Sequence, residues 1–145
     1  MNITTAFITA QCTVIMVGMK SLTYYDSPVG RLTLIEEDGV LTHLLFDTDH
    51  GQGQVPSDTV EQKTEFLSTV ESQLDEYFAG TRKDFVLPLK PSGTVFQLAA
   101  WEALTAIPYG ETRSYGQQAA AIGKPKAARA VGGANNKNPI SIIVP

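Results

Sequence analysis

The segment best suited to a specific chemical task spans residues 126–134 and reads KAARAVGGA. It carries one long side chain in its middle, Arg129, within a run of small residues. Two glycines late in a helix cost about 1 kcal/mol each relative to alanine, so helix propensity does not explain them. Small side chains let another backbone come close, which predicts either tight packing against a neighbouring helix or close approach to DNA. In the DNA interpretation, Arg129 projects from the helix into a minor groove that is only about 6 Å wide.

Residues around this segment are suited to contacts with a phosphate backbone. Tyr115 lies just inside the start of the preceding helix, where its hydroxyl and the free backbone N–H groups can both face a phosphate. The alternative interpretation of Tyr115 is an aromatic side chain in the core or at its rim. The candidate DNA-contacting residues are Tyr115, Lys124, Lys126, Ala127, Ala128, Arg129 and Gly132.

The sequence offers little for nucleophilic or metal chemistry. Its single cysteine, Cys12, has no proline before it and no histidine after it, and is expected to be a small buried or incidental residue. His43 is expected in a strand and His50 in a loop. Together with Cys12 these histidines match no metal-ligand spacing. We therefore predict no metal site and no cofactor.

The composition is that of an ordinary globular protein, with 145 residues, 43% hydrophobic and 18% charged. This length fits one domain or two small ones. A single cysteine cannot form an internal disulfide, which favours a reducing, cytoplasmic location. The most apolar stretch, residues 6–18, is shorter than the roughly 20 residues that a membrane-spanning helix needs. No membrane association is therefore expected.

The net charge of −4 hides an asymmetry along the chain. Residues 1–90 contain six basic and 13 acidic residues, a balance of −7. Residues 91–145 contain five basic and two acidic residues, a balance of +3, and no acidic residue follows Glu111. A basic stretch on an acidic body can approach a polyanion through one face, although this asymmetry alone is weak support for nucleic-acid binding.

Residues 20–90 are predicted to form a small sheet with one helix. Three antiparallel strands are expected at residues 22–25, 31–36 and 40–46, joined by turns at residues 27–30 and at Asp38-Gly39. A helix is expected from about residue 59 to residue 78, because apolar residues recur at spacings of three and four and Gly80 follows as a C-terminal cap. Residues 86–89 are expected to be a short strand or an extended connector.

Residues 91–145 are predicted to be mainly helical. Capping-box spacings at residues 94–97 and 114–117 start two helices, and Pro108 ends the first of them. A third helix is expected over residues 125–134, so that the second and third form a helix-turn-helix pattern. Residues 140–144 are an apolar β-branched run that indicates a buried strand. The first helix is expected to bury Phe96, Ala99, Ala100, Ala103 and Ile107.

Three motifs in this half point to a known family. They are IPYGETRSYGQ at residues 107–117, PKAARAVGGA at residues 125–134, and NP at residues 138–139 followed by IVP at residues 143–145. Residues 94–145 thus closely resemble the 6-O-alkylguanine-DNA alkyltransferases, the methylated-DNA–protein-cysteine methyltransferases. The resemblance implies an α+β fold: a small N-terminal ribonuclease-H-like antiparallel sheet with a helix, then a helical, winged-helix-like domain with a helix-turn-helix. The expected ranges are 20–90 and 91–145, after an unmatched leader at residues 1–19.

The resemblance also implies an activity in DNA repair. Family members bind double-stranded DNA through the minor groove, flip 6-O-alkylguanine into a pocket and transfer its alkyl group to their own cysteine. On this basis, Arg129 matches the residue that fills the space left by the flipped base. Tyr115 matches the residue that crowds the adjacent phosphate, and Asn138 matches the hinge between recognition helix and active-site strand. The implied partner is DNA containing 6-O-alkylguanine, and a monomer is expected.

In this family the nucleophilic cysteine, followed by histidine and arginine, comes directly after the position of Pro145, where the given sequence ends. No residue of the chain is therefore assigned as the catalytic nucleophile. Three interpretations stay open. The chain is a C-terminally incomplete form of a working alkyltransferase, inactive as given; a non-catalytic alkyltransferase-like protein that flags alkylated DNA for other repair; or a helix-turn-helix regulator.

Overall fold

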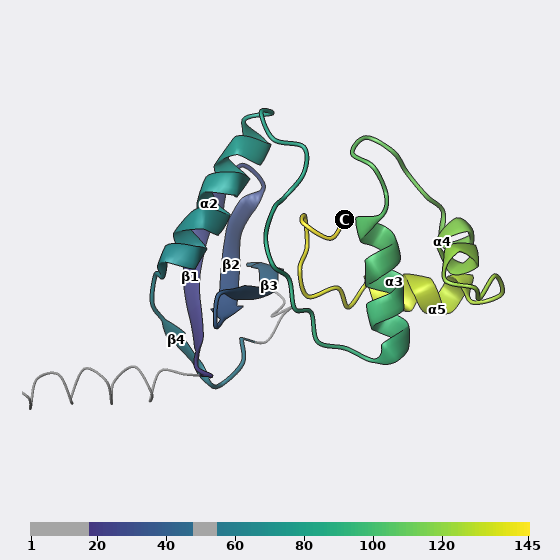
Figure 1. Ribbon diagram of the computed structural model, residues 1–145, viewed down its shortest axis with the longest axis horizontal. Helices are drawn as coiled ribbons and strands as arrows, with labels where there is room; N and C mark the ends of the chain where they lie inside the picture. Colours follow the sequence, from purple (N-terminus) through teal and green to yellow (C-terminus); the bar gives the residue numbers. More distant parts are fainter. Residues whose placement is uncertain (1–17, 48–54) are drawn as a thin grey trace, which may run out of the picture.

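The computed structural model describes residues 18–47 and 55–145. β1 (Lys20–Ser27), β2 (Gly30–Glu37) and β3 (Val40–Phe46) form an antiparallel meander, and β4 (Thr59–Glu61) pairs in parallel with β1. The strand order is β3-β2-β1-β4. The helix α2 (Glu65–Phe78) packs against β1 and β2 and runs roughly along the direction of these strands (Figure 1). The expected α+β fold is confirmed, with a sheet that is mixed because of its short fourth strand.

The turn between β2 and β3 sets the register of the meander. Asp38 (φ 52°) and Gly39 (φ 77°) both adopt the left-handed conformation that a two-residue type I′ turn requires. Asp and Gly accept this conformation more readily than other residues, so the predicted turn is confirmed. The sheet then presents leucines to a core that it shares with α2 and with the C-terminal half. The buried members of this core are Leu32, Leu34, Leu41, Leu44, Leu67, Val70, Leu74, Trp101, Leu104, Ile140 and Val144.

The helix predicted from about residue 59 begins later, at Glu65. Thr59–Glu61 form β4 instead, because the free edge of β1 offers hydrogen-bonding partners that a local pattern cannot reveal. Thr64 caps the helix, and its hydroxyl accepts a hydrogen bond from the backbone N–H of Leu67 at 3.1 Å. The other end agrees with the prediction, since Gly80 follows the last turn with a φ of 79°.

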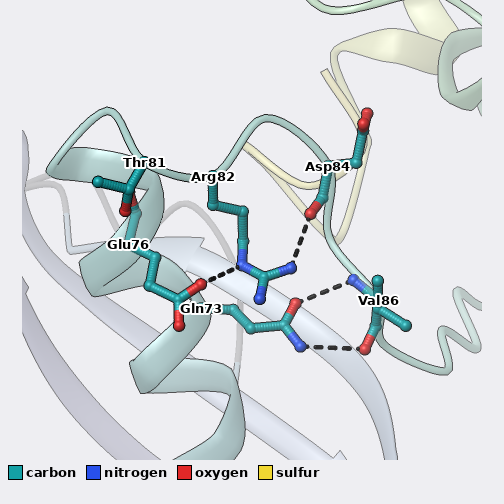
Figure 2. Close-up of polar contacts among 6 residues, drawn as sticks. All are labelled: Gln73, Glu76, Thr81, Arg82, Asp84 and Val86. Carbon is teal, nitrogen blue, oxygen red and sulfur yellow. Dashed lines mark hydrogen bonds and ion pairs between the residues drawn. The ribbon is translucent and has the colours of Figure 1, made fainter.

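The connector that leaves α2 is held by side-chain hydrogen bonds (Figure 2). Gln73, which is 8% exposed, pairs with both main-chain groups of Val86. Its Nε2 donates to the Val86 carbonyl at 3.1 Å, and its Oε1 accepts from the Val86 N–H at 2.9 Å. Arg82 donates to the Glu76 carboxylate at 2.7 Å and to the Asp84 carbonyl at 3.0 Å. These bonds hold the connector against α2 as an extended segment.

The helices α3 (Val95–Thr105), α4 (Tyr115–Ala121) and α5 (Ala128–Asn135) form the C-terminal half, beside the sheet (Figure 1). Both predicted capping boxes are present, at residues 94–97 and 114–117. The helix α5 starts three residues later than predicted, because Pro125 belongs to the turn that precedes it. None of the helices in the described ranges is both long and apolar enough to cross a bilayer.

The buried face of α3 differs from the prediction. Ala100, Trp101 and Leu104 are its buried residues, whereas Phe96, Ala99, Ala103 and Ile107 are only half-buried. The indole N–H of Trp101 donates to the Ala134 carbonyl at the end of α5, at 2.9 Å. This tertiary hydrogen bond turns the tryptophan face of α3 toward the core.

The predicted strand at residues 140–144 is wrong, because these residues form a turn. Ile140 makes one parallel bridge to Leu44 of β3, and Ile142 then takes a left-handed conformation with a φ of 72°. The side chain of Asn138 closes the turn. It donates to the Val144 carbonyl at 2.6 Å and accepts from the Ile140 N–H at 3.0 Å. A segment closed on itself in this way cannot extend as a strand.

A hydrogen bond between two ionisable side chains, Tyr25 and Asp75, joins β1 to α2. The phenol of Tyr25 donates to the Asp75 carboxylate at 2.6 Å, and burial followed by this hydrogen bond raises the pKa of Tyr25 from 10.0 to about 12. The folded state therefore holds the phenolic proton more tightly than the unfolded state does. The stabilisation is complete below pH 10 and is lost as the pH rises toward 12.

We expect Tyr25→Phe to remove this loss of stability between pH 10 and 12. The free energy of unfolding, measured by urea denaturation at a series of pH values, tests the expectation. Tyr24→Phe serves as the control, because it removes an exposed phenol of the neighbouring residue. An identical alkaline dependence in Tyr25→Phe and in the unsubstituted protein would contradict the assignment.

Candidate nucleic-acid interface

The two helices α4 and α5 are fixed to each other and to α3 by a hydrogen-bonded pair of side-chain amides, of which one is buried and the other half-buried. Gln118, 4% exposed, donates to the Asn135 side chain at 3.1 Å and accepts from it at 2.8 Å. The same Nε2 also donates to the Ala100 carbonyl of α3, at 2.8 Å. Sequence reasoning missed both residues, although a glutamine on the inner side of a short helix was the available signal. The pair sets the angle of the helix-turn-helix.

The residues of α5 are divided between a buried side and an exposed side of the helix. Val131 and Ala134 face the core. Arg129 and Ala130 are exposed, and so is Gly133 about one turn later, so the guanidinium projects from an outer surface made of small residues. Ala127, Ala128 and Gly132 are half-buried and contribute less to that surface.

The two glycines of α5 have different surroundings. A Cβ atom at Gly132 would lie 3.0 Å from Cε2 of Tyr115, which is closer than ordinary van der Waals contact. Gly132 therefore makes room for the tyrosine ring, as the packing interpretation predicts. A Cβ atom at Gly133 would meet nothing within 4 Å, so this position opens outward.

Tyr115 links the start of α4 to α5. It is the first residue of α4 and follows Ser114, whose hydroxyl accepts from the Gln117 N–H at 3.1 Å. One edge of its ring packs on Gly132, yet the side chain stays 55% exposed. The hydroxyl-bearing ring and the first turn of α4 are thus both near the outer surface of α5.

The cations near this surface have no carboxylate partner among the residues that the structure describes. Arg129, Lys124 and Lys126 are exposed, and none of them forms an ion pair within residues 18–47 and 55–145. The ammonium of Lys124 lies 5.6 Å from the centroid of the Phe96 ring, a cation–π distance that holds it beside α3. An uncompensated positive surface of this kind attracts a polyanion.

A cleft of about 900 Å³ adjoins this surface between the two halves of the chain. Its walls are the connector at residues 83–85, the loop at residues 107–113, Tyr115, Asn138 and the turn at residues 141–145. Across it, the ammonium of Lys83 lies 5.8 Å from the centroid of the Tyr109 ring. Tyr115 is shared by the cleft and the outer surface of α5, so a group leaving a bound duplex there would find space beside it.

The described residues hold no cluster of three or more histidine, cysteine, aspartate or glutamate side chains that could bind a metal ion. His43 Nδ1 lies 3.0 Å from the Thr42 hydroxyl in β3. Burial, with a smaller contribution from Lys20, lowers the pKa of His43. Cys12 and His50 lie outside the described residues.

The two halves of the chain match the two domains of one known family. Residues 21–91 match the ribonuclease-like domain of 6-O-methylguanine DNA methyltransferase, and residues 95–145 match its DNA-binding domain. The chain belongs to the 6-O-methylguanine DNA methyltransferase family. The resemblance drawn from the motifs is therefore confirmed, and so are the fold class and the helical character of the second half.

Relatives in this family match most of the chain. The methylated-DNA–protein-cysteine methyltransferase of Methanosarcina acetivorans is 48% identical over 121 residues, which cover 83% of this chain and 77% of the relative. The constitutive enzyme of Bacillus subtilis is 44% identical over 129 residues, covering 88% and 78%. Among solved structures, Mycobacterium tuberculosis OGT in complex with DNA has a TM-score of 0.78 at 46% identity, covering 86% of this chain and 74% of that one.

Proposed function

We propose that this protein acts in DNA repair by binding double-stranded DNA that contains 6-O-alkylguanine through the outer surface of α4 and α5. The observation that carries the proposal is Arg129, exposed among small residues and without a carboxylate partner in the described chain. The relative crystallised with DNA supports it.

The proposed roles follow from position. Arg129 enters the duplex where the alkylated base leaves the stack. The helix can come close enough to the DNA because its neighbouring exposed residues, Ala130 and Gly133, have small side chains or none. Tyr115 crowds the neighbouring phosphate, and the first turn of α4 offers its free N–H groups to the same anion. Lys124 and Lys126 add contacts to the backbone, and the flipped base enters the adjoining cleft.

Asn138 links the DNA-contacting helix to the turn that lines the cleft. Its side chain forms hydrogen bonds with both ends of the segment from Ile140 to Val144, so the position of this turn is fixed relative to the end of α5. We assign Asn138 as the hinge between DNA recognition and the alkyl-acceptor site of the family.

Binding should depend on salt through the number of phosphates that the basic residues neutralise. Five basic residues follow residue 91, so the slope of log K against log salt concentration is expected to be no steeper than about −4.5. Fluorescence anisotropy with a labelled duplex over a salt series measures the slope. A slope near zero would remove the DNA-binding proposal.

The 145-residue chain is expected to show no alkyl transfer. In the family reaction a thiolate attacks the alkyl carbon, a carbon–sulfur bond forms, the bond to guanine O6 breaks and guanine is restored in the DNA. The only thiol of the sequence is Cys12, which lacks the residues that would activate it.

Incubation with a duplex that carries a labelled methyl group tests this expectation, and mass spectrometry of the protein gives the readout. The Bacillus subtilis relative is the positive control on the same DNA. A stoichiometric adduct on the 145-residue chain would show that the expectation is wrong.

A further inference from the structure

The outer edge of β3 binds two segments that connect the halves of the molecule. At one point, the Leu41 N–H donates to the Pro88 carbonyl at 2.9 Å, and the Leu41 carbonyl accepts from the Lys90 N–H at 2.9 Å. These bonds attach the connector from α2 to α3.

The second attachment lies three residues further along β3. The Leu44 N–H donates to the Pro139 carbonyl at 2.8 Å, and the Leu44 carbonyl accepts from the Ser141 N–H at 3.2 Å. The attached segment comes from α5 through Asn138 and continues into the turn that lines the cleft. β3 thus fixes where this turn lies relative to the sheet.

A regular strand could not make both attachments. In a regular antiparallel strand the main-chain groups of successive residues point alternately to the two neighbours, and the side chains alternate between the two faces. Leu41 and Leu44 are an odd number of residues apart, yet both use their main-chain groups on the outer edge. Both side chains are also fully buried in one core cluster.

A bulge at Thr42 resolves this conflict. Ile35 pairs with His43 and Glu36 pairs with Leu41. Thr42 is therefore the extra residue, which has no opposite residue in the register between β2 and β3. The extra residue shifts the alternation by one, which turns both leucines to the same edge and into the same core.

The side chain of Thr42 holds the bulge. Its hydroxyl is buried and donates to the Ile35 carbonyl at 3.1 Å. Since the single hydroxyl proton is used in this bond, the contact of 3.0 Å with His43 Nδ1 is one in which the ring N–H donates to the hydroxyl oxygen.

We propose that Thr42 is a positioning residue: its bulge lets one edge of the N-terminal sheet hold both the interdomain connector and the segment that runs from the DNA-contacting helix to the cleft. The functional part of this inference rests on the proposed function, because the cleft is then the site that receives the flipped base. The N-terminal sheet thus helps to position the turn at residues 141–145, which lines that cleft.

Amide hydrogen exchange, resolved by residue with NMR, tests the inference in the full chain. Thr42→Val keeps the shape of the side chain but removes its donor, so exchange at Leu44 and Ser141 is expected to become roughly tenfold faster, the effect of losing about one hydrogen bond. Thr42→Ser keeps the hydroxyl and is expected to restore slow exchange. Amides in the β1–β2 ladder serve as the internal reference and are expected to be unchanged.

Two results would overturn the inference: unchanged exchange at Leu44 and Ser141, or an equal increase throughout the β1–β2 ladder, which indicates general destabilisation. If Thr42→Val does not fold, Ser141→Pro removes the N–H that bonds to Leu44 without altering β3. It is then expected to speed exchange at Leu44 but not at Lys90, and equal effects at both would also overturn the inference.

Binding of an unmodified duplex separates this inference from the proposed function. Both Thr42 variants are expected to keep the affinity of the unsubstituted protein, because the outer surface of α4 and α5 is not altered. A loss of affinity in Thr42→Val alone would contradict the assignment of Thr42 to the cleft side. An unsubstituted protein that binds no duplex would overturn the proposed function, while the exchange result on β3 would still stand.

Discussion

Replacing Arg129 with alanine is expected to weaken binding to a duplex that contains a flipped or mismatched base by about 1–3 kcal/mol, the range for inserted or stacked contacts. The guanidinium is exposed on the small-residue side of α5, where no described carboxylate competes for it. Its removal leaves the gap in the base stack unfilled. The dissociation constant, measured by anisotropy at one fixed salt concentration, gives the change.

Two further variants make this experiment specific. Arg31→Ala removes the same side chain from β2, where it is paired with Asp26, and should leave DNA affinity unchanged. Lys126→Ala removes a candidate phosphate contact, so it should weaken binding to fully paired and mismatched duplexes alike. If Arg129→Ala binds the mismatched duplex as tightly as the unsubstituted protein does, the small residues of α5 serve packing alone.

Replacing Trp101 with alanine is expected to lower the free energy of unfolding by about 3–5 kcal/mol. The side chain is 3% exposed and belongs to the core that both halves share. Its indole N–H also donates to the Ala134 carbonyl at 2.9 Å, so the substitution leaves a cavity and removes the partner of a buried acceptor. Gly93 packs against the same ring, since a Cβ there would lie 2.7 Å from it.

Trp101→Phe separates the two contributions. Phenylalanine fills most of the space but cannot donate to Ala134, so its cost is expected to be about 1–3 kcal/mol. Urea denaturation followed by far-ultraviolet circular dichroism is the suitable measurement, because Trp101 is the only tryptophan and fluorescence would be lost with it. Equal losses for the two substitutions would contradict a role of the ring in filling the shared core.

Features that depend on a few adjacent residues could be predicted from the sequence. The Asp38-Gly39 turn is one, because these residue types accept a positive φ. The capping boxes at Thr94 and Ser114 are others, because each is closed by a glutamine three residues later. The three strands of the meander follow in turn from their hydrophobic pattern and the turns between them.

Features that depend on distant partners could not be predicted in this way. Thr59–Glu61 form β4 only because the edge of β1, more than 30 residues earlier in the chain, is free to pair with them. The burial of Trp101 on α3 follows from a carbonyl 33 residues away. In each case the deciding hydrogen bond joins residues that a local pattern treats separately.

The candidate interface likewise has features that local sequence determines and features that depend on distant partners. Residue types alone determined that the chain has a slim helix with one central arginine, a tyrosine at the start of the preceding helix, and a basic C-terminal half. Only the tertiary structure decided that Gly132 makes room for Tyr115 while Gly133 opens outward, because the two glycines are identical in sequence and differ only in what lies opposite them. The tertiary structure also decided that the bulged strand β3 forms hydrogen bonds both with the connector from α2 to α3 and with the segment that follows α5. The reason is that the partners of a strand edge are residues distant in sequence, which only the fold brings there.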